Sequence, residues 1–475
     1  MTKQNKNSLP KQEKPQQENL TTILEGAKID LAGRIFNAAI RYFYVFLLAR
    51  FLGAELMGIF FLGIIIVEIS GVFSRLGLET GVIKYVSIFL SQSDDQRTKG
   101  IIKSALLLSV MTSIIIAIVL FSCAEFIAND IFKKPGLNLI LKILSVSLPF
   151  SSAMFILLSA TQGFHTLKYK VYVEFLTNPA LNIFLLILIF AIGFSLEGAA
   201  LTFVFAFFFC SFLSFYFLKV LFPGITSSKL KTIFETKKLI KFSSPLILIN
   251  LLSLLMMWTD ILMLGYFKSG ADVGIYNTVV KTAFFINFII MSFTSIFAPR
   301  ISELYFNKQK KELEALFKTV TRWIFGMSIP LFIIIVIFAK NILSLFGEQF
   351  ISGSTSLVIL AVAHLANASV GAVRYVLMMS ENEKIVMYNT VIFSILNILL
   401  NMILIPKYGI NGAALATAIN LARNSFEPGS LNLNKWKNEF KSSHNSWNAS
   451  IWDFPCGELP RRPGFVYWKQ KRYEF

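Results

Sequence analysis

The sequence predicts an all-α integral membrane protein made of two six-helix lobes that are related by an internal repeat, with the last transmembrane helix cut short. Of the 475 residues, 55% are hydrophobic and only 15% are charged, whereas soluble domains carry about a quarter charged residues. Apolar runs at 104–121 and 181–195 approach the length that crosses a hydrocarbon core of about 30 Å. We therefore expect the chain to cross a bilayer many times.

Short motifs recur about 216 positions apart. Gly-Ile-Phe at 58–60 returns as Gly-Ile-Tyr at 274–276, and Gly-Ala-Ala-Leu at 198–201 returns at 412–415. Duplication of a helix bundle is a common way for a transporter to acquire two lobes with a binding site between them. We therefore expect two repeats of six spans each.

Hydropathy divides the chain into spans and segments. Spans are predicted at 30–52, 58–78, 101–123, 139–161, 172–194, 198–221, 240–266, 273–299, 320–341, 353–379 and 385–405, and a twelfth begins near Asn411. This organisation gives an N-lobe at 29–222, a basic cytoplasmic linker at 223–238 and a C-lobe at 239–422. The polar residues 1–28 are expected to be a disordered cytoplasmic tail.

Lysine and arginine residues concentrate at the amino terminus and in the loops after spans 2, 4, 6 and 8. The positive-inside rule then places both termini on the cytoplasmic side of the inner (cytoplasmic) membrane. The net charge of +18 is therefore mainly a topology signal. Because the basic residues form no single patch, we expect no nucleic-acid partner.

The carboxyl-terminal region departs from the repeat. The match to span 6 ends near Ala422, and 423–475 is polar with interspersed Trp residues. A dozen apolar residues are too few to cross a bilayer. We favour the interpretation that the reading frame changes near residue 423; a cytoplasmic recognition tail is the alternative.

Charged residues at membrane depth are the candidate site, because they are costly there and mark function by default. Span 1 holds Arg34, Arg41 and Arg50, which we assign to substrate binding. Arg34 and Arg41 are seven residues apart and share a helix face. For Arg34 and Arg50 the competing interpretation is that the side chains extend to the lipid headgroups from the helix ends.

Three further charges lie in other spans. Glu68 is in span 2 and Lys281 is in span 8. The repeat offset puts these two at nearly equal depth in opposite lobes, so we expect them to face each other across a central cavity, or else to form a buried structural ion pair. Asp260 in span 7 is a second acidic group, which either serves in coupling with Glu68 or orders a helix end. Lys281 joins the arginines as a substrate-binding candidate.

A set of motifs carries a family resemblance. They are Ala-Arg-Phe-Leu-Gly-Ala-Glu at 49–55, Asp-Ile-Leu-Met-Leu-Gly at 260–265, Asp-Val-Gly-Ile-Tyr at 272–276 and Tyr-Gly-Ile-Asn-Gly-Ala-Ala at 408–414. In this order and spacing they resemble the polysaccharide biosynthesis family of lipid-linked oligosaccharide flippases, which includes O-antigen flippases and shares a superfamily with the MATE exporters. The resemblance covers about residues 25–420.

The resemblance implies a cationic central cavity and the flipping of a polyprenyl-pyrophosphate-linked oligosaccharide. The chain would then be a monomeric transporter and not an enzyme, with a polysaccharide polymerase and glycosyltransferases as partners. It would need no cofactor, and H⁺ or Na⁺ exchange or the membrane potential would drive it. The alternatives are a MATE-type drug or cation antiporter and a membrane scaffold without transport activity. The arginines of span 1 disfavour the antiporter, which needs a free cavity carboxylate instead.

Overall fold

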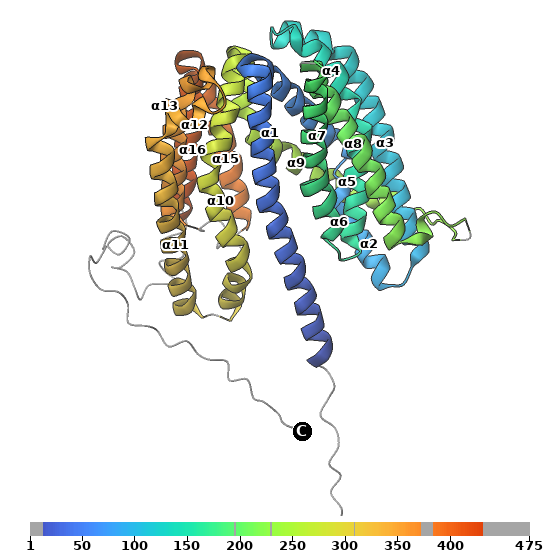
Figure 1. Ribbon diagram of the computed structural model, residues 1–475. Coiled ribbons are helices and arrows are strands. Elements are labelled where there is room, and N and C mark those ends of the chain that lie inside the picture. The colour runs from blue at the N-terminus through green and yellow to red at the C-terminus, as the bar shows by residue number, and fades with distance from the viewer. Residues whose placement is uncertain (1–12, 194–195, 229, 308, 372–382, 431–475) are drawn as a thin grey trace, which may run out of the picture. The chain divides into compact units, whose positions relative to one another are not determined.

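The computed structural model describes residues 13–193, 196–228, 230–307, 309–371 and 383–430, and no strand occurs among them. The elements are α1 (Glu13–Arg75), α2 (Leu78–Ser91), α3 (Asp95–Phe126), η1 (Ile127–Ile131), α4 (Gly136–Ser145), α5 (Ser147–Gly163), α6 (Lys168–Lys170), η2 (Val171–Thr177), α7 (Asn178–Ala191), α8 (Leu196–Leu221), η3 (Pro223–Ile225), α9 (Thr236–Phe267), α10 (Gly270–Phe306), α11 (Lys310–Ile337), α12 (Ala339–Ser344), η4 (Glu348–Gly353), α13 (Ser354–Val370), α15 (Glu383–Tyr408) and α16 (Ile410–Ser430). The all-α prediction is confirmed (Figure 1).

Nine helices in the described ranges are long and apolar enough to cross a membrane, or up to ten when a bent pair is taken as one span. The protein is therefore a multi-pass membrane protein. The predicted total of twelve spans stays a prediction, partly because the end of the span expected at 353–379 lies outside the described residues.

The first two predicted spans form one long element with a break inside it. Gly53 in α1 has φ 72° and ψ 178°, which is not helical. A positive φ of this kind is open to glycine because it has no Cβ. The break separates the predicted span at 30–52 from the one at 58–78.

The predicted span at 139–161 is also interrupted. The chain forms α4 and α5, which are bent by 43° with respect to each other at Val146. Pro149 explains the break, since it lacks the backbone N–H that would bond to the carbonyl of Ser145.

Two groups of helices pack within the compact unit that spans residues 1–425. In the N-lobe, α3 packs on α5 and α5 packs on α8; in the C-lobe, α10 and α11 both pack on α13. The long helix α1 contacts both groups, through α3 and α4 on one side and α10 on the other. Figure 1 shows α1 between these groups.

The amino-terminal end of the described chain differs from the expected disordered tail, and the prediction for the carboxyl-terminal tail stays a prediction. Helix α1 begins at Glu13, so residues 13–28 are helical where a disordered tail was expected, because they are rich in good helix formers and place Pro15 in the first turn. At the other end, the apolar part of α16, Ile410–Ala422, is shorter than the candidate membrane spans. The predictions for 1–12 and for most of 423–475 lie outside the described residues.

Candidate functional site

Three of the predicted charged residues come together where α1 meets α10. Arg41 and Glu68 lie on α1, on opposite sides of its break, and Lys281 lies on α10. Each of the three acts electrostatically on the others. Next to them, the hydroxyl oxygens of Tyr42 and Thr282 are 3.1 Å apart. The pairing of α1 with α10 therefore joins charges that are far apart in sequence.

The immediate surroundings of these charges differ. Arg41 is exposed, and its Nε donates a hydrogen bond to Asn37 Oδ1 at 3.1 Å. The Nζ of Lys281 lies 5.3 Å from the centre of the Trp258 ring, a cation–π contact. Glu68 and Lys281 are both half-buried, and no ion pair within 4.0 Å joins these two described residues. Their attraction acts through space, with the lysine held over the indole ring.

A fourth charge, Arg75, was not assigned to the site from the sequence. It also acts on Glu68, and its Nε forms an ion pair of 2.5 Å with Glu79 Oε1. The guanidinium carbon lies 4.8 Å from the centre of the Phe155 ring. Arg75 is seven residues after Glu68 and so shares its helix face; that spacing was the available signal.

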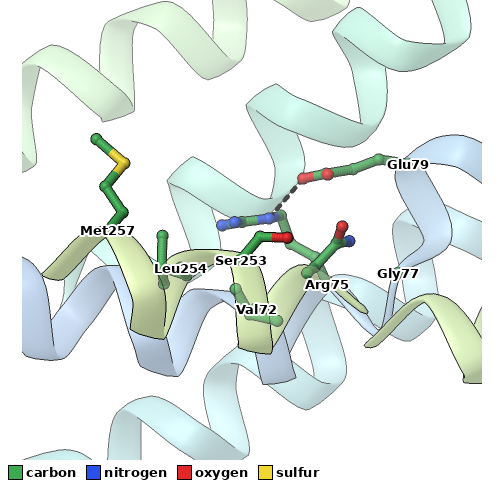
Figure 2. A pocket seen from close by; sticks show the side chains of 8 residues that line it. Val72, Arg75, Gly77, Glu79, Ser253, Leu254 and Met257 are labelled. Carbon is green, nitrogen blue, oxygen red and sulfur yellow. Dashed lines mark ion pairs between the residues drawn. The ribbon is translucent and has the colours of Figure 1, made fainter. Parts of the chain in front are cut away.

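Arg75 lines a cavity of about 240 Å³ between α1 and α9. The lining residues are Val72, Arg75, Gly77, Glu79, Asn250, Ser253, Leu254 and Met257. Figure 2 shows Leu254 and Met257 of α9 beside Val72 and Arg75 of α1. The cavity is thus shared by the N-lobe and the C-lobe, and its polar groups include a guanidinium, a carboxylate, an amide and a hydroxyl.

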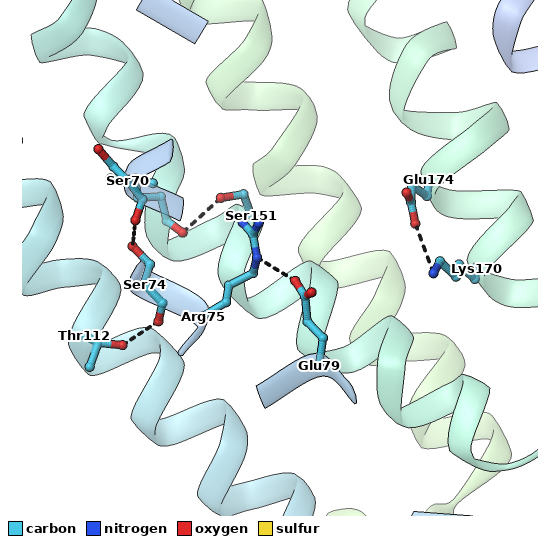
Figure 3. A network of polar contacts seen from close by, with 9 residues as sticks. Ser70, Ser74, Arg75, Glu79, Thr112, Ser151, Lys170 and Glu174 are labelled. Carbon is cyan, nitrogen blue, oxygen red and sulfur yellow. Dashed lines mark hydrogen bonds and ion pairs between the residues drawn. The ribbon is translucent and has the colours of Figure 1, made fainter. Parts of the chain in front are cut away.

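A hydroxyl group of α3 bonds to the end of α1, next to a serine bond within α1 (Figure 3). Ser74 Oγ donates to the carbonyl of Ser70 at 3.0 Å, and Thr112 Oγ1 donates to the carbonyl of Ser74 at 2.6 Å. Ser74 is fully buried. Because the donors satisfy backbone carbonyls near the end of α1, they help to set the position from which Arg75 reaches the cavity.

Asp260 belongs to a different cluster, inside the C-lobe. Its Oδ1 accepts a hydrogen bond from Asn401 Nδ2 at 2.6 Å, and its Oδ2 accepts one from the Tyr276 hydroxyl at 3.1 Å and another from Thr417 Oγ1. Asn401 Nδ2 also donates to Asn397 Oδ1 at 3.0 Å. Side chains of α10, α15 and α16 thus bond to one carboxylate on α9, so Asp260 joins four helices and does more than order the end of one.

The remaining two predicted arginines lie elsewhere on α1. The guanidinium of Arg34 is 5.6 Å from the Phe175 ring, and Arg34 acts electrostatically on Glu174 of η2. The guanidinium of Arg50 is 5.9 Å from the Phe46 ring on the same helix. Both arginines are exposed. Among the described residues, neither acts on Glu68 or Lys281.

The two lobes touch closely at the motifs that repeat in the sequence. A Cβ on Gly58 would come within 1.8 Å of the Gly270 carbonyl oxygen, and a Cβ on Gly274 would come within 2.2 Å of the Ala54 carbonyl oxygen. Only glycine permits such an approach of two backbones. Gly58 and Gly274 are equivalent positions of the predicted repeat, and the repeat itself stays a prediction.

A lysine strengthens the same contact from the loop between η1 and α4. Lys134 Nζ donates to the carbonyls of Gly265 at 2.6 Å and Lys268 at 2.7 Å, at the end of α9. Lysine at a helix carboxyl end satisfies carbonyls that lack partners within the helix. Burial lowers the pKa of Lys134 from its ordinary 10.5, and the nearby carboxylates of Glu55 and Asp272 partly oppose this.

Comparison with known families agrees with this architecture. A family model described as polysaccharide biosynthesis protein matches residues 23–305, more than half of the chain. The chain belongs to the polysaccharide biosynthesis protein family. The matched segment contains Arg41, Glu68, Arg75 and Lys281. A second family model, described as MatE, matches residues 245–403 of this polysaccharide biosynthesis protein. This second segment contains Asp260.

Two curated proteins of Haloferax volcanii are similar to parts of this polysaccharide biosynthesis protein. One is the probable low-salt glycan biosynthesis flippase Agl15, 26% identical over 201 residues, which cover 42% of this chain and 43% of that protein. The other is the probable flippase AglR, 28% identical over 174 residues, which cover 35% of this chain and 36% of that protein. The chain thus spans less than half of the length of these curated relatives.

Solved structures share the fold. An inward-facing multidrug resistance MATE family transporter of the MOP superfamily has a TM-score of 0.70 at 15% identity, covering 85% of this chain and 96% of that one. The lipid II flippase MurJ in an inward closed conformation has a TM-score of 0.68 at 16% identity, covering 85% and 87%. At such identities the likeness shows the fold alone, and it confirms the MATE-like fold expected for this family.

Proposed function

We propose that this protein translocates a polyprenyl-pyrophosphate-linked oligosaccharide across the cell membrane. The observation that carries the proposal is the charge around the junction of α1 and α10. Among the described residues, Arg41, Arg75 and Lys281 act on Glu68 or pair with Glu79, and Arg41 also acts on Glu174, which Lys170 already pairs at 4.0 Å. Cations therefore outnumber carboxylates in this region. Uncompensated positive charge is costly at membrane depth, and a pyrophosphate group would offset that cost.

Each cation has a distinct part in this proposal. Arg41 is exposed and uses one N–H on Asn37, which leaves donors of its planar fork for bidentate phosphate contacts. Arg75 is held by Glu79 until a phosphate competes for it. Lys281 offers a point charge that can turn from the Trp258 ring towards an anion. Glu68 attracts all three and would draw them together again after the substrate leaves.

Asp260 is the group that we propose for coupling. Its oxygens, with those of Asn397, Asn401, Thr417 and Tyr276, form a set of oxygen ligands of the kind that hard cations prefer. Exchange of Na⁺ or H⁺ at this carboxylate, or the membrane potential acting on the anionic substrate, would drive transport. Such a mechanism needs no cofactor.

Several further points belong to the same proposal. One Haloferax volcanii relative is named a probable low-salt glycan biosynthesis flippase and the other a probable flippase, and both names support a flipping role that is not enzymatic. The distribution of lysine and arginine supports cytoplasmic termini in the inner membrane. Glycosyltransferases would supply the substrate and a polysaccharide polymerase would consume it. The protein would act as a monomer.

A MATE-type cation antiporter is the second candidate, because the MatE match covers Asp260 and three of its cluster partners, Tyr276, Asn397 and Asn401. The surplus of positive charge at Arg41, Arg75 and Lys281 argues against a cationic cargo, which these residues would repel. A scaffold without transport would leave these costly charges without a purpose.

The deciding experiment uses purified protein in liposomes that contain a polyprenyl-pyrophosphate oligosaccharide in both leaflets. A glycosidase added outside digests only the outer pool unless the protein flips the rest. We expect digestion to exceed one half and to approach completion with the wild type, and to rise above one half about 10- to 100-fold more slowly with Arg41→Ala. Digestion that stops near one half with the wild type, together with uptake of a cationic dye against a Na⁺ or H⁺ gradient, would favour the antiporter instead.

A further inference from the structure

A second cavity, of about 310 Å³, lies in the N-lobe. It shares no residue with the charges at Arg41, Glu68, Arg75 and Lys281 or with the Asp260 cluster. Its lining residues are Ile102, Lys103, Leu106, Leu157, Phe215, Ile225 and Thr226. They come from α3, α5, α8 and the segment that begins with η3. Its volume is at the lower end of the range of about 300–1,000 Å³ that is usual for ligand sites.

The wall of this cavity is held in place by a buried lysine. Lys99 of α3 is only 3% exposed, and its Nζ donates to the carbonyls of Ser227 at 2.6 Å and Leu230 at 2.9 Å. These bonds tie down the segment that carries Ile225 and Thr226. The predicted basic linker is therefore packed against the N-lobe at this point.

The cavity combines an apolar floor with a cation at its rim. Ile102, Leu157 and Ile225 are buried. Lys103 is exposed, and the structure records no ion pair for it with a described acidic residue. Whereas Lys99 is committed to backbone carbonyls, Lys103 lies one turn later on the same helix with its charge available.

The surroundings of the cavity are those of a lipid boundary. Leu107 on α3 and Phe212 on α8 are each 60% exposed, and both helices are candidate membrane spans. The cavity lies near the beginning of α3 and the end of α8, both candidate membrane spans, so we expect it at the level of the lipid headgroups. Lys219 is exposed one turn after Phe215 on α8 and adds positive charge at the same end.

We propose that this cavity binds an anionic phospholipid of the surrounding bilayer, with an acyl chain against Ile102, Leu157 and Ile225 and the phosphate at Lys103. The acyl chain leaves hydrocarbon for an apolar wall at little net cost, because lipid tails are as apolar as the side chains that they meet. The charge of Lys103 then supplies the preference for an anionic headgroup, and a soluble anion has no acyl chain to fill the apolar floor. The bilayer supplies such amphiphiles at high local concentration. This site is independent of the glycan-lipid pathway.

The test measures bound phospholipid by native mass spectrometry of the full-length protein, released from nanodiscs that contain equal amounts of phosphatidylglycerol and phosphatidylethanolamine. Lys103→Gln is expected to lower the preference for phosphatidylglycerol about five-fold, since one lysine near an anionic surface contributes about that factor. Thr226→Trp, at the exposed rim, is expected to block the cavity and to remove both lipids. Lys241→Gln, an exposed lysine outside the cavity, serves as the matched control and should bind as the wild type does.

Two results would overturn the proposal. One is unchanged phosphatidylglycerol binding by both Lys103→Gln and Thr226→Trp. The other is displacement of the lipid by millimolar inorganic phosphate, which would show a simple anion site. Because the measurement does not involve transport, its outcome is separate from that of the flipping assay.

Discussion

Glu55 Oε2 accepts a hydrogen bond from the backbone N–H of Ala271 at 2.6 Å, and these two residues are 216 positions apart. The carboxylate lies at the amino end of α10, where unpaired N–H groups favour a negative charge. The same separation relates Gly58 to Gly274, whose backbones cross next to this bond. The contact between the lobes is thus built from positions that the predicted repeat would make equivalent.

Closeness of the lobes at this crossing depends on the absence of a side chain at Gly58. We expect Gly58→Ala to force the backbones of α1 and α10 apart, at a cost of about 1–3 kcal/mol or more. Spin labels at the exposed positions Lys133 and Lys407 would report longer distances between the lobes. Gly326→Ala is the control, since a Cβ there meets nothing within 4 Å; equal distance distributions for both variants would contradict the prediction.

Removal of positive charge from the α1–α10 junction should impair transport. Arg41→Ala and Lys281→Ala are each expected to slow glycan-lipid flipping about 10- to 100-fold, the usual value of a charge-assisted hydrogen bond. Arg41→Lys should keep part of the activity, because its charge remains and its bidentate geometry is lost. Arg50→Ala is the control, as Arg50 lies apart from the cluster over Phe46. Full activity of both alanine variants at normal membrane levels would refute the cationic site.

Glu68 and Lys281 should be energetically coupled although they form no direct ion pair. Loss of one partner leaves the other charge uncompensated in a half-buried place. We therefore expect the double variant Glu68→Gln with Lys281→Gln to be more stable than the sum of the single effects predicts, by about 1 kcal/mol. Thermal unfolding in detergent of all four proteins measures this term. Strict additivity would mean that the two charges do not interact.

Asp260→Asn should remove any dependence of transport on Na⁺ or pH, because it keeps the size of the side chain and removes its charge. Thr417→Val is expected to weaken this dependence, since it deletes one hydroxyl donor to the carboxylate. The control is Thr294→Val, whose hydroxyl bonds to the carbonyls of Ile290 and Met291 of its own helix. Flipping rates across a series of Na⁺ concentrations and pH values provide the measurement, and an unchanged ion dependence of Asp260→Asn would exclude coupling at this residue.

The contact of Lys134 with the end of α9 should strengthen as pH rises. Its pKa in the packed structure is below the ordinary 10.5, so the separated state binds a proton more readily than the packed state. Between the lowered pKa and 10.5, each rise in pH therefore favours packing, and the effect ends above 10.5. Distances between labels at Lys133 and Lys407 should shorten over this range. Lys134→Met should abolish that pH dependence, and an identical response of the variant would contradict the assignment.

Much of the architecture followed from the sequence by itself, because a bilayer demands long apolar helices and leaves charges in the loops. The apolar runs revealed the helices, and Arg41, Glu68 and Lys281 stood out as costly charges. The spacing of Glu68 and Arg75 held a further signal that only became meaningful once both were seen on one face of α1.

Only the tertiary structure decided how these charges are partnered. Pairing of α1 with α10 brings Lys281 towards Arg41 and Glu68, and the Lys281 amine lies over the Trp258 ring. Asp260 gains partners from three other helices. Such contacts depend on how each helix is rotated and on which distant segments cross. Hydropathy alone carries no information about either, because it records how apolar each segment is and not which face meets which neighbour.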